Sequence, residues 1–527
     1  MTRRARLALA AVLGASLLLD AWGIRWGLAG DYSWAPDELL PSAVREGVGQ
    51  RFSHGWHEKY GPFHFAVLAL AYLPALAARR LGLLAADQPD FDRILALVGR
   101  LVSLLMATGT VWLVARCGRE LGDEWAGILG AGFTGTSATF VYYAKTANLD
   151  VPYLFWFALS LLFYVRLLER HRMADYLGFA AAAAAAVATK DQACGLYVLA
   201  PLGVGAALHL RRSDEGDRRI MGTLADPRLL GSLGLGLALL LLFDNVLLNP
   251  AGFLAHLRLI AGPASHPFRM FDNDLAGHVA LARQTVRHLG FAMGWPAFLV
   301  CASGVAAALA RARPHRRWLW LLAPVVSYSI TFLHVVLYGY DRFVLPIALV
   351  LSLFGGRLLA RGLRSPPPLR TAAAALAVAV FTYSIAYAAS VDRLLAGDSR
   401  YAVERWLAAN VPADALVAAV GPLEYLPRMR GPRWRRLGPS VARLVQVHPD
   451  FVVVNAGYAA RADPGTGERA LYDGLFAGRL GYRLALRQRT PPGWSLIDPA
   501  ALGQDRPDRV FSNLDKVDPE ICVFRRE

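Results

Sequence analysis

Stretches of apolar residues long enough to cross a lipid bilayer recur along most of this 527-residue chain, and no other feature restricts its fold as strongly. An α-helix needs about 20 mostly apolar residues to cross the hydrocarbon core. Only 18% of the residues are charged, whereas a soluble domain carries about 25%, and the mean hydropathy is +0.35. The sequence therefore predicts a polytopic α-helical membrane protein.

Short clusters of Arg separate the apolar runs, and such clusters mark cytoplasmic loops. They are Arg3/Arg4/Arg6, Arg116/Arg119, Arg166/Arg170/Arg172, Arg211/Arg212/Arg218/Arg219, Arg311/Arg313/Arg316/Arg317 and Arg357/Arg361/Arg364/Arg370. Two apolar runs of spanning length lie between each cluster and the next, which predicts about eleven helices in all. Because the first Arg cluster lies at the start of the chain, the N-terminus is predicted to be cytoplasmic. The predicted spans are 7–28, 96–115, 125–143, 151–168, 176–189, 193–210, 228–248, 289–310, 318–337, 343–360 and 371–390.

One apolar run, residues 63–78, does not fit this alternation. If this run crossed the membrane, every later Arg cluster would be placed on the outer side instead of the cytoplasmic side. The run is also short for a span. We therefore predict a juxtamembrane or re-entrant helix on the outer face, inside a long first outer loop over residues 30–95. Together with the spans, this loop forms a predicted transmembrane domain, residues 1–390.

The composition changes in residues 391–527, which have more Pro, Gly and charge and no apolar run of spanning length. Short apolar stretches bounded by turn residues are typical of strands, and this region contains "ALVAAVG", "DFVVVNAG", "YRLALRQR" and "ICVFRRE". The stretch "RYAVERWLAANV" has helical spacing. We expect a small extracytoplasmic α/β domain.

Two other classes of protein do not fit the sequence. A formal charge of +16 can indicate nucleic-acid binding, but here most Arg residues lie in short loops between apolar runs. The four cysteines are scattered and form neither a disulfide framework nor a CxxC metal motif. The N-terminal apolar run lacks a convincing cleavage site and is interpreted as a retained signal-anchor.

Two adjacent carboxylates, Asp37 and Glu38, follow the first apolar run in the stretch "APDEL". Carboxylates beside a membrane are costly unless they are hydrated or paired. They could belong to a solvated acidic loop, or to the first turn of a helix begun by Pro36, where the helix dipole favours anions. They could also be functional, and these readings stay open on the sequence of this loop alone.

Further polar groups are predicted on the same outer side. Asp150 opens an apolar run just before Pro152, as a helix cap or as a functional carboxylate. Arg342 follows two Tyr at the start of another run, as a snorkelling residue in an aromatic belt or as a functional cation. Only four of the 56 basic residues are Lys, and three are expected at this side: Lys59, Lys145 and Lys190.

A carboxylate with several cations beside a bilayer suits one class of reaction. The carboxylate can deprotonate an acceptor hydroxyl. Cations or a metal ion can stabilise a departing phosphate. A leaving group made of lipid phosphate would place its phosphate at this surface.

Seven stretches of the chain form a recognisable series: "WAPDEL", "HEKYGPFHFAVLALAYL", "RLVSLLMATGTVWLVARCGRELGDEWAGILGAGFTG", "AKTANLDVPYLFWFALSLLFYVRLL", "YDRFVLPIALVL", "ERWLAANVPADALVA" and "FSNLDKVDPEICVFRR". Through them the sequence resembles a known family, the lipid-phosphate-dependent glycosyltransferases of the protein-O-mannosyltransferase and lipid A aminoarabinose transferase type, which have the GT-C fold. The order and spacing of these stretches cover essentially the whole chain. The segment "KYGP" departs from the family, which often has two Pro after this Lys.

The resemblance implies roles for individual residues. Asp37 would be the general base on the acceptor, with Glu38 its neighbour in the site. Asp150 would position the acceptor or a metal ion. Lys59 would bind the donor phosphate, with help from Arg342.

Three further roles are less directly implied. Lys190 is a candidate phosphate ligand, although Asp191 stands next to it where relatives often have Gly. His54 and His57 are candidate ligands for a divalent metal ion, which only some members of the family use.

The function implied by the resemblance is an inverting glycosyltransferase, either hexosyl or pentosyl, in a bacterial inner membrane. It would move a sugar from a polyprenyl-phosphate donor to a glycan, lipid or protein acceptor at the outer face. A transporter or flippase for a lipid-linked or sugar substrate is the alternative, favoured by Asp20 and Asp244 within or near spans. A non-catalytic assembly subunit with the same fold is a third possibility.

Overall fold

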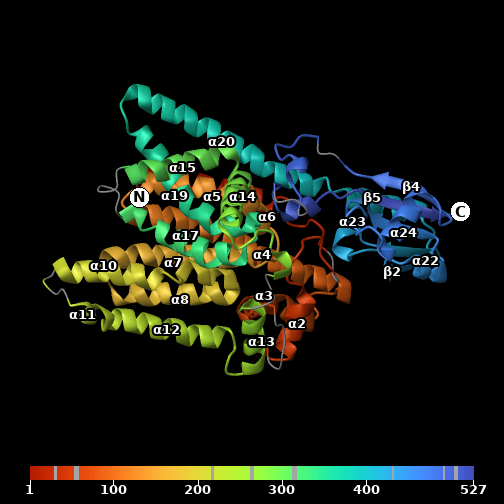
Figure 1. Cartoon of the computed structure of the whole chain (residues 1–527), viewed down its shortest axis with the longest axis horizontal. Helices are drawn as coiled ribbons and strands as arrows, with labels where there is room; N and C mark the ends of the chain where they lie inside the picture. Colours follow the sequence, from red (N-terminus) through yellow and green to blue (C-terminus); the bar gives the residue numbers. More distant parts are fainter. Residues whose placement is uncertain are drawn as a thin grey trace.

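The computed structural model of the chain describes residues 1–28, 32–52, 59–214, 216, 219–261, 266–310, 317–429, 433–490, 493–503 and 508–527. Its larger part is a bundle of long helices, and its smaller part is a sheet domain attached to one end of that bundle (Figure 1). The N-terminus lies at the opposite end of the bundle from the sheet domain. That the two lie on opposite sides of a membrane stays a prediction.

Helices occupy all eleven predicted spans. The main bundle helices are α1 (Arg3–Ala21), α4 (Gln88–Glu120), α5 (Glu124–Gly135), α6 (Ala138–Ala144), α7 (Asp150–Arg170), α8 (Met173–Thr189), α10 (Ala200–Asp214), α12 (Pro227–Phe243), α14 (Leu275–Met293), α15 (Trp295–Ala310), α17 (Leu322–Tyr328), α19 (Leu345–Leu363) and α20 (Pro367–Ala396).

Fewer of these helices qualify as full spans than hydropathy predicts. Within the described part of the chain, six helical stretches are long and apolar enough to cross a membrane, and α14 with α15, bent by 118°, can supply a seventh. The helices α8 and α12 have only 17 residues each, or about 26 Å at 1.5 Å per residue. Several of the other predicted spans hold short helices, such as α8 and α12, or an interrupted pair, such as α5 and α6.

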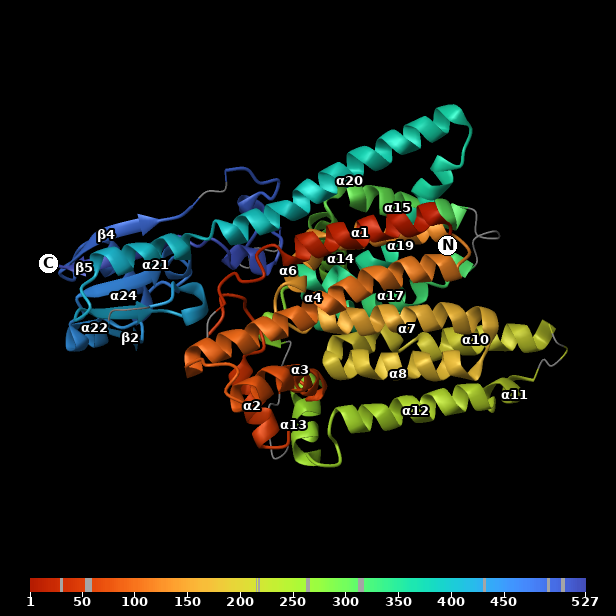
Figure 2. The same ribbon diagram turned by 180° about the vertical axis from the view of Figure 1, so that it is seen from behind.

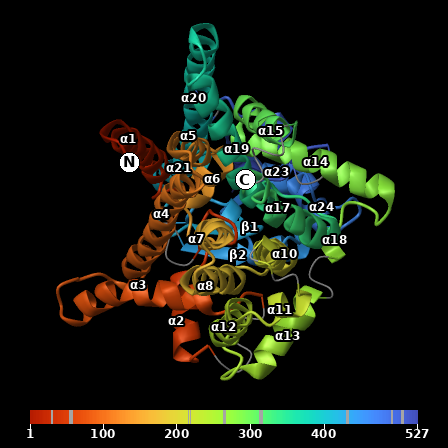
Figure 3. The ribbon, with the colours of Figure 1, turned by 90° about the vertical axis from the view of Figure 1, so that its left-hand side faces the viewer.

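The run at residues 63–78 forms α3 (Phe63–Arg80), which is not among the candidate spans of the described residues. Viewed along the bundle, α7, α8, α10 and α12 are seen end-on while α3 is seen lengthwise (Figure 3). With α2 (Pro41–Gly49) and α13 (Pro250–Ala261), it lies at the end of the bundle that carries the sheet domain (Figure 2). This is the placement expected of a juxtamembrane helix.

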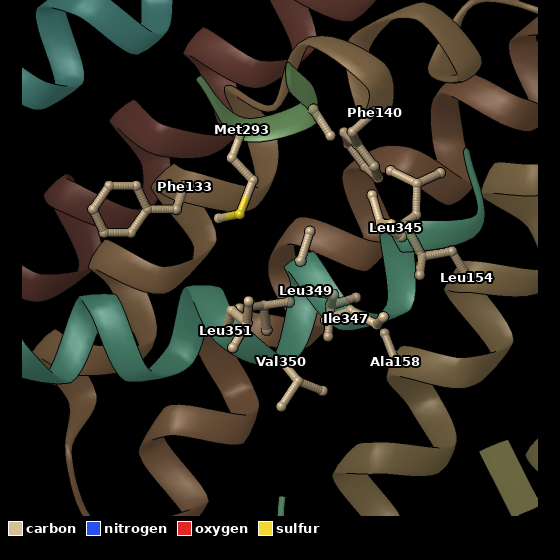
Figure 4. Packing of buried hydrophobic residues seen from close by; sticks show 14 of the residues in the cluster. Phe133, Phe140, Leu154, Ala158, Met293, Leu345, Ile347, Leu349, Val350 and Leu351 are labelled. Carbon is tan, nitrogen blue, oxygen red and sulfur yellow. The ribbon is translucent and has the colours of Figure 1, made fainter. Parts of the chain in front are cut away.

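The core of the bundle is built around α19, whose residues are buried on nearly all sides. Its first turns pack Leu345, Ile347 and Leu349 among side chains from α5, α6 and α7, including Phe140 and Leu154 (Figure 4). A helix fixed in this way holds the residues just before it in place. One of those residues is Arg342.

The C-terminal domain is a five-stranded mixed sheet with the order β2-β1-β3-β5-β4. Its strands are β1 (Leu416–Val420), β2 (Arg433–Leu437), β3 (Phe451–Asn455), β4 (Tyr482–Gln488) and β5 (Ile521–Arg526). β2 and β3 lie parallel to β1 on its two sides, and β5 runs antiparallel to both β3 and β4. Helices α21 (Ser399–Asn410), α22 (Val441–Val447) and α24 (Gly467–Phe476) accompany the sheet.

The sheet domain is tied to the bundle by two segments. The connection before β5 returns to the bundle, where Val510, Phe511 and Leu514 join its hydrophobic core. In the first outer loop, the buried indole of Trp34 donates a hydrogen bond from Nε1 to the carbonyl of Leu426 at 3.0 Å. Both segments lie beside the groups described next.

Candidate active site

Arg342 stands at the centre of a cluster of charged side chains. It lies in a short 3-10 helix, Asp341–Val344, directly before α19. Its Nη1 is 2.9 Å from Asp37 Oδ2 and 3.8 Å from Asp150 Oδ2. One guanidinium therefore joins the carboxylate of the first outer loop to the carboxylate that opens α7.

Asp37 reaches this cluster from a tight turn. Its φ of +61° is in the left-handed region, which Asp adopts more readily than most residues. Lys59 lies on its other side, with Nζ 3.4 Å from Asp37 Oδ1. Burial would raise the pKa of Asp37, but the charges of Arg342 and Lys59 and the hydrogen bond from Arg342 lower it well below its usual value.

Asp150 is the first residue of α7 and is almost fully buried. It is not the N-cap of the helix, a position that Leu149 occupies, and its own backbone N–H donates to Asn148 Oδ1 at 2.8 Å. The Asp150 carboxylate instead accepts from Lys190 Nζ at 2.6 Å and faces Arg342. Its position in the first turn also suits the helix dipole.

Lys190 follows the last residue of α8 and belongs to the same cluster. Burial lowers its pKa to about 8, even though the negative charge of Asp150 acts in the opposite direction. Asp191 turns away from the cluster, with Oδ1 2.9 Å from Nε2 of His256. Asp191, the departure from the family pattern next to Lys190, therefore does not lie in the charged cluster.

Glu38 points in another direction from Asp37. Its oxygens accept hydrogen bonds from Arg100 Nε and Nη2 at 2.6 and 2.7 Å, and from the backbone N–H of Ala147 at 2.7 Å. The hydroxyl of Ser33 also donates to it. Neither Glu38 nor Arg100 is exposed by more than 3%. No helix starts at Pro36, and the turn at Asp37 sends the two adjacent carboxylates to different partners.

Lys145 also has a structural place. Its ammonium is buried against Asp392 and donates to the carbonyls of Leu19 and Trp22, both at 2.8 Å. It ties the end of α1 to α20 rather than joining the charged cluster. Asp20, one of the residues that favoured a transporter, lies in the last turn of α1 and accepts from Ser16 Oγ at 3.1 Å.

The C-terminal domain contributes groups that the sequence did not single out. Asp341 accepts from Ser512 Oγ at 2.7 Å, and the Tyr340 hydroxyl donates to Asn513 at 2.6 Å. This docking brings Lys516 near the cluster: burial lowers its pKa, Asp37 raises it and Arg342 lowers it. Lys516 is the fourth of the rare lysines, and that scarcity was the one signal for it in the sequence.

A metal site is not assembled by the described residues. Among them, no group of three or more His, Cys, Asp or Glu side chains is placed to hold a metal ion. His54 and His57, the candidate ligands, lie outside the described residues. We therefore derive no chemical step through a metal.

Comparison with known proteins identifies the fold. Residues 94–213 match the sequence profile of the family described as dolichyl-phosphate-mannose-protein mannosyltransferase. An Archaeoglobus fulgidus oligosaccharyltransferase, solved with a tethered acceptor peptide containing the NVT sequon, aligns over 100% of this chain and 89% of its own at 12% identity and a TM-score of 0.53. Its apo form aligns over 99% and 88%, also at 12% identity, with a TM-score of 0.51.

ArnT from Cupriavidus metallidurans bound to undecaprenyl phosphate aligns over 98% of this chain and 97% of its own, at 14% identity and a TM-score of 0.46. A search of curated protein sequences finds no match. The predicted resemblance and the GT-C-like fold with its small C-terminal domain are confirmed. The chain is a multi-pass membrane protein with a glycosyltransferase fold.

Proposed function

We propose that this GT-C chain is an inverting glycosyltransferase that moves a sugar from a polyprenyl-phosphate donor to an acceptor at the outer face of a bacterial inner membrane. The observation that carries the proposal is the meeting of Asp37, Asp150 and Arg342, which come from three distant parts of the sequence. Lys59 and Lys190 complete this charged cluster.

The balance of charge in the cluster favours an anionic ligand. With Lys190 protonated, three cations face two carboxylates. A phosphodiester, which carries one negative charge, would neutralise the difference. As the sugar departs, the phosphate gains further negative charge, and fixed cations stabilise that developing charge. The undecaprenyl phosphate named in the ArnT structure is the phosphomonoester that a donor of this kind leaves behind after its sugar departs.

Asp37 is proposed as the general base on the acceptor hydroxyl. While it is paired with Arg342 and Lys59, its low pKa makes it a weak base. A donor phosphate that takes over Arg342 and Lys59 would remove these neighbours, and the pKa of Asp37 would then rise toward its usual value. Binding of the donor would therefore activate the base as well as place the leaving group.

Asp150 is proposed as a positioning residue. Its contact with Lys190 and its approach to Arg342 hold both cations in place when Asp37 releases Arg342. Transfer in a single displacement needs the base and the leaving phosphate on opposite faces of the sugar. Inversion therefore requires the ion pair between Asp37 and Arg342 to open and admit the sugar between them.

The proposal is tested by transfer of label. The purified chain is incubated in detergent with a panel of polyprenyl-phosphate sugars, each radiolabelled in the sugar, and with bacterial membranes as the source of acceptor. We expect one donor to label an acceptor fraction, and the anomeric configuration of the product to be opposite to that of the donor. Binding without transfer for every donor would contradict the proposal, and a retained configuration would contradict inversion.

A further inference from the structure

The sheet of the C-terminal domain has a crevice at its topological switch point, between β1 and β3. After β1 the chain crosses to β2 on one side, and it then returns to β3 on the other side. The loops that follow β1 and β3 therefore diverge, and ligands bind to parallel sheets at such a switch point, outside the carboxyl ends of the strands. A cavity of about 180 Å³ lies at this position, lined by residues after β1, after β3 and before β5.

The lining of this switch-point crevice mixes aromatic and charged groups: Tyr425, Asn455, Tyr458, Arg461, Lys516 and Glu520. The rings of Tyr425 and Tyr458 are tilted by 40°, with their centroids 6.1 Å apart. Aromatic faces pack well against the C–H groups of a sugar ring. The cavity is smaller than the pockets that hold drug-sized ligands, so a single sugar unit suits its size.

Lys516 gives the crevice a cation that is available to a ligand. Arg461 is engaged by Asp515, at 2.7 Å. The Lys516 ammonium is 3.3 Å from the Asn513 side-chain oxygen and lies over the Tyr425 ring. In the described part of the chain, no carboxylate oxygen lies within 4.0 Å of it. A carboxylate or phosphate on the ligand would supply the missing partner.

The crevice adjoins the charged cluster of the bundle. Lys516 belongs to the segment whose residues Ser512 and Asn513 bind the residues just before Arg342. On the other side, Trp34 fixes the first outer loop to Leu426, next to Tyr425. A molecule seated in the crevice would therefore lie beside the turn that carries Asp37.

We propose that the switch-point crevice binds the acceptor through a saccharide unit that carries an anionic group. The Tyr rings, which Asn455 ties together through Tyr425 O and Tyr458 N–H, would hold the face of the sugar. Glu520 Oε2, which Arg487 does not contact, would accept from a sugar hydroxyl, and Lys516 would bind the anion. The assignment of this saccharide as the acceptor rests on the proposed transferase function. The crevice therefore names a class of acceptor, an acidic glycan, for the same reaction.

The test measures binding to the full-length chain without any donor. Saturation-transfer NMR compares methyl glucuronide with methyl glucoside, which lacks the charge, and with an acetylated acidic tripeptide. We expect the glucuronide to bind most tightly. Lys516→Ala should weaken its binding about tenfold or more, the usual effect of losing a charge-assisted hydrogen bond. Tyr458→Ala should weaken both sugars.

Arg479→Ala is the matched control, because Arg479 is exposed and precedes the first residue of β4, at the end of the sheet away from the crevice, and its loss should leave binding unchanged. Tighter binding of the peptide, or glucuronide binding unaffected by both crevice variants, would overturn the inference. Because no donor is present, a chain that fails to transfer sugar but binds glucuronide in the crevice contradicts the proposed reaction alone. A chain that transfers sugar but does not bind glucuronide contradicts the acceptor assignment alone.

Discussion

The adjacent carboxylates of Asp37 and Glu38 have different partners, and a prediction follows for the buried one, Glu38. Its carboxylate and the Arg100 guanidinium are almost fully buried and share two hydrogen bonds of 2.6 and 2.7 Å. Glu38→Gln removes the negative charge and leaves Arg100 buried without a counter-ion. Breaking a buried ion pair from one side costs about 3–5 kcal/mol. The remaining amide oxygen can still accept one bond, so we expect the lower end, about 3 kcal/mol.

Asp37→Asn should behave differently, although the two residues are neighbours in sequence. Asp37 is 29% exposed, and Arg342 keeps Asp150 as a second partner. We expect its effect on the free energy of unfolding to stay within about 1 kcal/mol. Thermal unfolding of the purified chain in detergent, followed by tryptophan fluorescence, compares the two variants with the parent.

The expected result is a clearly lower Tm for Glu38→Gln and a nearly unchanged Tm for Asp37→Asn. Glu38→Gln protein that remains folded should still transfer sugar, because Glu38 does not contact the charged cluster. An unchanged Tm for Glu38→Gln would refute the argument that this carboxylate anchors the first outer loop. Loss of transfer in folded Glu38→Gln protein would place Glu38 in the site after all.

Three further variants address the cations. Lys59→Ala should raise the donor KM about tenfold and leave the acceptor KM unchanged, and equal effects on both would exclude a phosphate contact. Arg342→Lys should lower kcat/KM about a hundredfold, because the single ammonium nitrogen of Lys lacks the other N–H groups with which a guanidinium can face the carboxylates and a phosphate together. Near-parental values in steady-state kinetics would show that this is wrong. The pKa of Lys190 is about 8, so Lys190 loses its charge as the pH rises through that value, and the donor KM should rise there. The Lys190→Arg variant stays charged and should not show this rise. The same pH profile of the donor KM in both proteins would count against the role of Lys190.

Much of the architecture was readable from the sequence because one physical demand dominates it. Backbone groups in hydrocarbon must be satisfied within helices, so long apolar runs predicted helices wherever they occur. The interpretation of α3 as a juxtamembrane helix also came from the sequence, because a span at this point would have put the later Arg clusters on the wrong side of the membrane. The described residues form six or seven candidate spans where about eleven were predicted. One reason is that a helix such as α12, which ends at Phe243, stops before its predicted span, residues 228–248, does.

The C-terminal sheet shows a complementary limit. The apolar strands β1, β3, β4 and β5 were predicted, while β2 was missed. Its sequence, Arg433–Leu437, is rich in Arg and mostly exposed at the sheet edge. An edge strand of this kind has no hydrophobic alternation, so only its pairing with β1 reveals it.

The residue types of the charged cluster could be predicted from the sequence, but the partner of each residue could not. The sequence placed Asp37, Asp150, Lys59, Lys190 and Arg342 on one side, and the fold brings all five together. It did not separate Glu38 from Asp37, because the left-handed turn and the buried Arg100 are properties of the folded chain. Lys145 likewise differs from its fellow lysines only through its tertiary partners.

The central claim is that Asp37 acts as the base and competes with the donor phosphate for Arg342 and Lys59. It is tested most directly by measuring donor binding and sugar transfer together in Asp37→Asn, with Asp90→Asn as the control, since Asp90 is exposed and pairs with Arg93 rather than with a residue of the charged cluster. The account predicts that Asp37→Asn binds the polyprenyl-phosphate sugar at least as tightly as the parent and transfers none of it. Transfer near the parental rate in the Asp37→Asn variant would contradict it.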